Sequence, residues 1–162
     1  MSSMHDITDR AERLVPTANI NATTMFVPLL DRFPLLCGVD VDRWDFVVTI
    51  AGVFVAITRL RGLNIEEVVE EGAEKIVITH LVNWDNRACD AFADCLAFFE
   101  ETCEKLQESG VERRWIASNA LGYWIIRNVL DTSPSPADAT QIIRVLGGMV
   151  IHAFQDWWIE RN

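Results

Sequence analysis

The chain is 162 residues long, half of its residues are hydrophobic and 23% are charged, and its formal net charge is -10. This composition predicts one folded domain with a sizeable core and excludes a disordered chain. The acidic balance argues against a nucleic-acid partner, which needs a basic protein face, and favours basic peptides or proteins as partners.

Residues 1–40 are the least regular part of the chain. Pro16, Pro28 and Pro34 interrupt short apolar runs there, and a proline inside a helix removes a backbone hydrogen bond. We therefore expect an N-terminal arm over residues 1–40 that is partly ordered and holds one or two short helices. The remaining residues, 41–162, are expected to form a helical domain.

The first long helix is predicted to begin after Asp40 or Asp42 and to run to about Leu60. Its middle is almost uniformly apolar, Asp40 or Asp42 is placed to cap its N-terminus, and Gly62 follows its last turn. The apolar stretch has about a dozen residues, whereas a membrane span needs about 20. The segment is therefore predicted to be a buried core helix.

Two amphipathic helices are predicted next. Asn64 and Glu67 have the spacing of a capping box, and the helix that they begin is expected to reach His80. The following helix is predicted over residues 87–108, with Gly110 ending it, and its apolar side chains recur three and four positions apart, as on one helix face. These side chains are Phe92, Cys95, Leu96, Phe99, Cys103 and Leu106.

The last two helices are predicted over residues 111–130 and from Pro136 to the end of the chain, with Ser135 as the cap of the second. Both are too apolar for surface elements. We therefore expect an all-α helical bundle in which this hairpin is the buried centre and the amphipathic helices wrap around it.

Two landmarks in the hairpin carry a family resemblance. Its first helix opens with Gly110-Val111-Glu112-Arg113-Arg114-Trp115-Ile116, and its second closes with Trp158-Ile159-Glu160-Arg161-Asn162. In this order and spacing they resemble the hairpin motifs of the B-cell lymphoma-2 (Bcl-two) family of apoptosis regulators, over roughly residues 42–162. The family's first motif, of the type Gly-x-Asn-Trp-Gly-Arg, is not preserved in its Asn-Trp-Gly-Arg core.

A third landmark lies in the helix that begins near Asn64. Val68-Val69-Glu70-Glu71-Gly72-Ala73-Glu74 resembles the family's third homology motif, with Val68 in place of the usual Leu and Ala73 in place of the usual Asp. Pro-death members need a potent third motif, so the degenerate one implies a pro-survival role. The compact chain, without a long loop between the first two core helices, is also similar to virus-encoded members.

The resemblance implies a hydrophobic groove that binds the amphipathic death-motif helix of a pro-apoptotic partner. In the family an arginine at the start of the hairpin pairs with an aspartate of the partner, and Arg113 or Arg114 matches that position here. A guanidinium group suits this task because it holds a carboxylate with two parallel hydrogen bonds. The groove walls are expected from Val69, Ala73, Ile76, Phe92, Phe99, Cys103 and Leu106.

Isolated proteins seldom leave a large apolar groove bare, so we expect a cover for it. A second copy of the chain would form a homodimer over it, or apolar side chains near the two chain ends would fill it. The latter are Phe26, Leu29, Leu30, Phe33, Trp157 and Trp158.

Cysteine usage favours a reducing compartment, since the four cysteines contain no CxxC pair and three share one predicted helix. They are Cys37, Cys89, Cys95 and Cys103. The resemblance implies a cytoplasmic protein that reaches the mitochondrial outer membrane of a host cell only through a tail that this chain lacks. It implies no catalysis, metal ion or cofactor.

Two other functions share some of these features. Glutamates on the two amphipathic helices suggest the magnesium site of an all-α nucleotide pyrophosphohydrolase, although their helical spacing is more typical of a solvated face. Small size, negative charge and a lack of catalytic motifs also suit an immunity or antitoxin-type protein that neutralises a basic toxin. The glutamates are Glu66, Glu67, Glu70, Glu71, Glu74, Glu100, Glu101 and Glu104.

Overall fold

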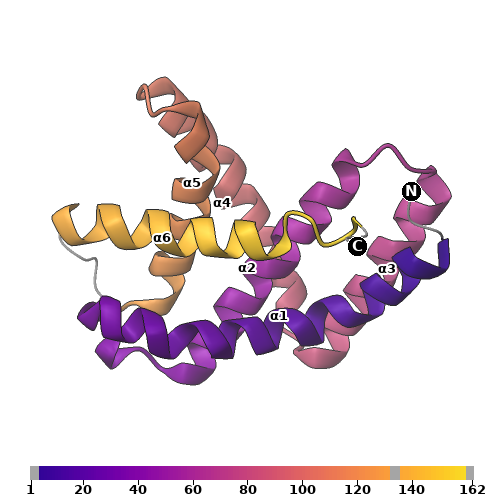
Figure 1. The fold of residues 1–162 in the computed structure, drawn as a ribbon, viewed down its shortest axis with the longest axis horizontal. Helices are drawn as coiled ribbons and strands as arrows, with labels where there is room; N and C mark the ends of the chain where they lie inside the picture. Colours follow the sequence, from indigo (N-terminus) through magenta and orange to yellow (C-terminus); the bar gives the residue numbers. More distant parts are fainter. Residues whose placement is uncertain (1–3, 132–135, 160–162) are drawn as a thin grey trace.

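The computed structural model describes residues 4–131 and 136–159, which form six α-helices and one short 3-10 helix, without a strand (Figure 1). This arrangement confirms the all-α class. Ser135 and Asn162 lie outside the described residues. The elements are α1 (Met4–Arg32), η1 (Pro34–Gly38), α2 (Val41–Gly62), α3 (Glu67–Trp84), α4 (Ala88–Glu108), α5 (Arg113–Val129) and α6 (Pro136–Phe154).

The N-terminal region holds one helix of 29 residues, α1, followed by the short η1, in place of the partly ordered arm with one or two short helices that we expected. It passes through Pro16 and Pro28, which are both exposed. By helix geometry, the carbonyl groups that lose their hydrogen bonds then lie toward solvent, where water satisfies them. The opposite face buries a stripe of side chains at helical spacing, which are Ile7, Ala11, Leu14, Ala18, Ala22, Met25 and Leu29.

Helix α2 is the centre of the bundle. Every residue from Val47 to Ile57 is buried, and α1, α3, α4, α5 and α6 all pack against it. Asp40 caps its N-terminus, since its carboxylate accepts hydrogen bonds from the backbone N–H groups of Asp42 and Arg43 at 2.8 and 3.2 Å. A helix that is apolar on all sides must be buried on all sides. The prediction of a core helix here is confirmed.

The hairpin of α5 and α6 differs from the expected buried centre. The two helices pack closely, because Gly122 and Gly147 let each backbone approach the other at the crossing. Each helix nevertheless keeps a solvent-facing side, with Tyr123 on α5 and Met149 on α6 exposed. Their apolar residues cover one face each, whereas those of α2 surround the helix.

The chain turns sharply after α6 instead of continuing as a helix. The Trp157 indole donates to the Arg10 carbonyl at 3.0 Å, and the Arg10 guanidinium donates to the Trp157 carbonyl at 2.7 Å. Trp158 is buried, and its indole donates to the Ala56 carbonyl at 2.6 Å. This C-terminal segment therefore ties α1 to α2. Among the described residues, no helix has the length and hydropathy to cross a bilayer.

Asp45, at the contact between α1 and α2, gives a pH-dependent prediction. Burial raises its pKa, which the Thr23 hydroxyl partly offsets, and its Oδ1 atom is buried without a hydrogen-bond partner among the described residues. The folded state therefore binds the proton more tightly than the unfolded state, and stability is lost as pH rises through the folded pKa.

We expect Asp45→Asn to raise the free energy of unfolding at pH 7, because the amide keeps the shape of the side chain without its charge. The gain should vanish below about pH 3, where aspartic acid is protonated in both states. Urea unfolding across this pH range measures the difference. If the difference in free energy of unfolding between the wild type and Asp45→Asn did not change with pH, this would contradict the role of Asp45 ionisation.

Candidate functional site

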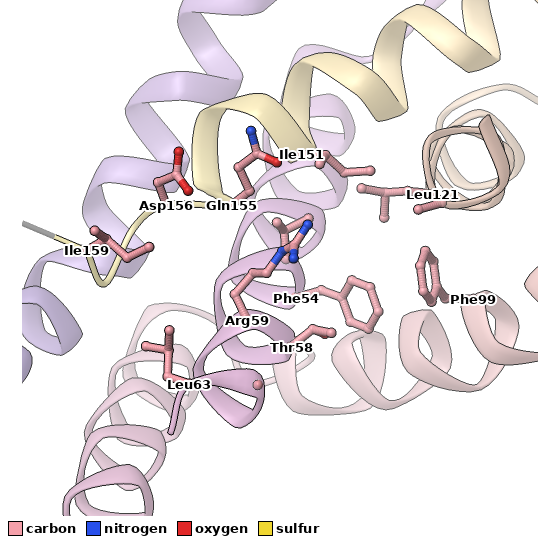
Figure 2. Close-up of a pocket in the computed structure, with 13 residues that line it drawn as sticks. Phe54, Thr58, Arg59, Leu63, Phe99, Leu121, Ile151, Gln155, Asp156 and Ile159 are labelled. Carbon is pink, nitrogen blue, oxygen red and sulfur yellow. The ribbon is translucent and has the colours of Figure 1, made fainter. Parts of the chain in front are cut away.

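A cavity of about 430 Å³ opens between α2, α4, α5 and α6 (Figure 2). Its lining is mainly apolar. The side chains that define it are Phe54, Thr58, Arg59, Leu63, Phe99, Leu121, Ile151, Gln155, Asp156 and Ile159. A concave, largely apolar surface with a few polar groups is typical of a binding site.

Two aromatic rings form one wall of this cavity. Phe54 comes from the buried centre of α2, and Phe99 comes from the apolar face of α4. Their ring centroids are 5.0 Å apart in an edge-on arrangement, which is a favourable geometry for an aromatic pair. Leu121 and Ile151 complete the apolar surface from α5 and α6. The wall is therefore fixed by the packing of four helices.

Charged groups stand among these apolar side chains. Arg59 lies in the last turn of α2, where the partial negative charge of the helix end favours a cation. Figure 2 shows its guanidinium group extending into the cavity, toward the space between Phe54 and Gln155. Asp156 lines the cavity from the segment that follows α6. The site thus combines apolar walls with an arginine that reaches inward.

The α3 residues predicted to line the groove do not line this cavity. α3 packs mainly against α1, and it makes few contacts with α2. Ala73 is buried, while Val69 and Ile76 are half-buried and pack against the core. These three side chains therefore lie elsewhere in the structure, because α1, which we expected to be a partly ordered arm, covers α3.

The predicted groove residues of α4 are divided between two places. Phe99 lines the main cavity, whereas Phe92 lines a smaller one of about 190 Å³ between α2, α3 and α4. Both rings contact Phe54, at centroid distances of 5.0 and 6.0 Å. The smaller cavity has Arg61 and Glu74 at its edge, with an N–O distance of 2.7 Å, and this hydrogen bond raises the pKa of Arg61.

The remaining predicted residues lie near the outer end of the α4–α5 hairpin. Cys103 and Leu106 are half-buried on the last turns of α4, and neither lines either cavity. Arg113 and Arg114 are exposed on the first turn of α5, which projects from the bundle (Figure 1). Arg114 pairs with Glu112 at 2.8 Å. Neither Arg113 nor Arg114 lines either of the two cavities.

Of the residues that line the main cavity, only Phe99 was predicted from the sequence as a groove residue, and Arg59 is among those that were missed. The signal for it was present, since Thr58 and Arg59 directly follow the long apolar run of α2. A charge at the exposed end of a buried helix marks the point where the core meets solvent. What the sequence did not indicate is that α4, α5 and α6 would border the same point.

Two of the four cysteine thiols, Cys95 and Cys103, have raised pKa values. Burial and the nearby Asp94 carboxylate raise the pKa of Cys95 well above its ordinary value, and burial raises that of Cys103. Both thiols therefore stay protonated at neutral pH and are poor nucleophiles. In residues 4–131 and 136–159, no three His, Cys, Asp or Glu side chains are grouped so that they could hold a metal ion.

Comparison with protein-family models, with curated proteins and with solved structures finds no match for this chain.

Proposed function

We propose that this chain is a helix-binding protein, acting as a pro-survival apoptosis regulator that sequesters the amphipathic death-motif helix of a pro-apoptotic partner. The observation that supports this proposal is the mainly apolar cavity with the exposed side chain of Arg59 in its lining. Amphipathic helices bind by placing apolar side chains in such a groove. A cavity of about 430 Å³ has room for a large aliphatic or aromatic side chain of the partner.

In this proposal Arg59 pairs with an acidic residue of the bound helix. The resemblance assigned that task to Arg113 or Arg114, but Arg59 is the arginine that lines the cavity. Its charge is placed next to Phe54, on apolar surface from which a bound helix would exclude water. A charge-assisted hydrogen bond is stronger in such surroundings than in water.

The proposal describes binding without catalysis, and it needs no cofactor or metal ion. It places the protein in the cytoplasm, including the surface of the mitochondrial outer membrane, and a virus-encoded regulator would act there in its host cell. The outer end of the α4–α5 hairpin, which projects from the bundle (Figure 1) and carries Arg113 and Arg114, is outside the cavity lining and stays free when the cavity is occupied.

Calorimetric titration with death-motif helical peptides tests the proposal. We expect saturable binding, and we expect Arg59→Ala to weaken it about 10-fold to 100-fold, as for the loss of a hydrogen bond between charged groups. Ala117→Trp, which places a large side chain at the cavity edge, should abolish binding.

Arg113→Ala and Arg114→Ala are the matched controls, since each removes one positive charge from an exposed site outside the cavity. Both should change the affinity less than twofold. Absence of binding to every peptide by the folded protein would refute the proposal. An equal loss in all three arginine variants would show a general charge effect and would remove the role of Arg59.

An immunity or antitoxin-type protein is the second candidate, and the acidic surface favours it. The exposed carboxylates on α3, on the residue that precedes it and on α4 would meet a basic toxin, and complexes held by exposed charges weaken steeply with salt. A death-motif helix buried in an apolar cavity would instead stay bound at high salt. The exposed residues concerned are Glu66, Glu67, Glu71, Glu100, Glu101 and Glu104.

A further inference from the structure

The solvent-facing side of α1 carries an unusual surface for so acidic a chain. No residue from 14 to 30 is charged, although the formal net charge of the protein is -10. This stretch of α1 is about 25 Å long at 1.5 Å per residue. Ile20 and Val27 stand out from it, 66% and 64% exposed, with Thr24 exposed between them. The uncharged face therefore projects β-branched side chains into water.

The same stretch has an approximate symmetry about Ala22. Pro16 and Pro28 lie six residues before and after it, and Arg13 and Asp31 lie nine residues before and after it. Arg13, Asp31 and both prolines are exposed, and Arg13 also forms an exposed ion pair with Asp9 of the same helix at 3.0 Å. If the helix is reversed end to end about Ala22, each proline takes the position of the other. Arg13 then takes the position of Asp31, and Asp31 that of Arg13.

We propose that two copies of the chain associate through this face, with their α1 helices antiparallel and a twofold axis near Ala22. Residues at equal distances before and after Ala22 then lie opposite each other in the two copies. Arg13 of each copy faces Asp31 of the other, so the pair forms twice. The Ile20 and Val27 side chains lie on the surface that closes between them.

A second copy fits this face better than an unrelated occupant does. Two chains of net charge -10 repel each other, and a twofold interface brings each surface patch against itself. An uncharged face adds no repulsion between the two copies. Its two ends carry opposite charges, so the face is complementary to itself when the two helices run antiparallel. Because the contact is one helix long, it lies at the small end of interface sizes, and we expect a dissociation constant of about 10–100 µM. The inference is independent of the proposed function.

Sedimentation equilibrium of the full chain over about 1 µM to 1 mM measures this association, in a range that brackets the expected constant. The average mass should rise from that of a monomer toward that of a dimer. Ile20→Arg should keep the protein monomeric throughout. Val68→Arg is the matched control, because Val68 is 72% exposed on α3 and outside this face; it should leave the association unchanged.

A charge exchange tests the antiparallel register. Arg13→Asp and Asp31→Arg should each weaken the association about 10-fold, because each brings like charges together twice. The double variant restores opposite charges and the original net charge, so it should recover the wild-type constant. Circular dichroism confirms that each variant is folded. A protein that stays monomeric at all concentrations overturns the proposal. So does a Val68→Arg variant that loses association as much as Ile20→Arg does, or a double variant whose dissociation constant stays higher than that of the wild type.

Discussion

Gly122→Ala and Gly147→Ala are each expected to lower the free energy of unfolding by more than about 3 kcal/mol, which is a large part of the stability of a typical domain. A methyl group on Gly122 would overlap the carbonyl of Ile143, and one on Gly147 would overlap the carbonyl of Ser118. Backbone atoms move only if α5 and α6 separate, and the buried contacts of both helices with α2 oppose that. Urea denaturation monitored by circular dichroism measures the loss.

Gly148 and Gly72 provide the controls for this prediction. Both lie within helices, and a Cβ atom at either position would meet nothing within 4 Å. Alanine at these positions should stabilise the protein by about 0.5–1 kcal/mol, because glycine is costly inside a helix. If Gly147→Ala behaved like Gly148→Ala, the close crossing of α5 and α6 would be excluded.

Trp158→Ala is expected to lower the free energy of unfolding by about 3–5 kcal/mol, as for other buried tryptophans. The side chain is among the largest that are fully buried, and it lies against α2, where its indole reaches the Ala56 carbonyl. Trp158→Phe keeps most of the apolar volume and loses the hydrogen bond, so a smaller cost of about 1–2 kcal/mol is expected. Thermal and urea unfolding distinguish these two losses.

Trp157 is the matched control, because it is half-buried one position earlier. Trp157→Phe removes the hydrogen bond to the Arg10 carbonyl while the core packing of Trp158 stays in place. It should cost less than Trp158→Ala by at least about 2 kcal/mol. Similar losses from both changes would show that the segment after α6 acts as a unit and that Trp158 has no special place in the core.

Local signals in the sequence predicted several helix limits correctly. The long apolar run and its flanking Asp40 and Gly62 marked α2, and the spacing of apolar residues marked α4. Gly110 adopts a positive φ of 81°, as expected for a glycine that ends a helix. These features depend on neighbours in the chain, which is why one sequence sufficed for them.

Features that depend on distant partners were predicted less well. Pro16 and Pro28 suggested breaks in α1, but the long apolar stripe against α2 and α3 outweighs the lost backbone hydrogen bonds. The Asn64–Glu67 capping box was wrong, since α3 begins at Glu67 and has no side-chain cap. Periodicity identified apolar faces, although it did not say which helix each face would meet.

The residues of the candidate site were also hard to predict, because they come from helices that are far apart in the sequence. Phe99 was expected on the apolar face of its helix, and it lines the main cavity; whether this cavity is the expected groove stays a prediction. Arg113 and Arg114 were placed by likeness to a family motif, and Arg59 was overlooked. The shape of a cavity among four helices depends on how the helices cross. Small residues such as Gly122 allow the close crossing, and the sequence alone does not show which helix lies against them.

The C-terminal segment has a consequence for biosynthesis. Trp158 is translated 102 residues after Ala56, and Trp157 is translated 147 residues after Arg10. At about 5–20 residues per second, the ribosome needs several seconds or more to span that interval. During this time α2 has left the ribosome without the side chain that closes its surface. The nascent chain is therefore expected to bind chaperones until residues 155–159 pack against α1 and α2.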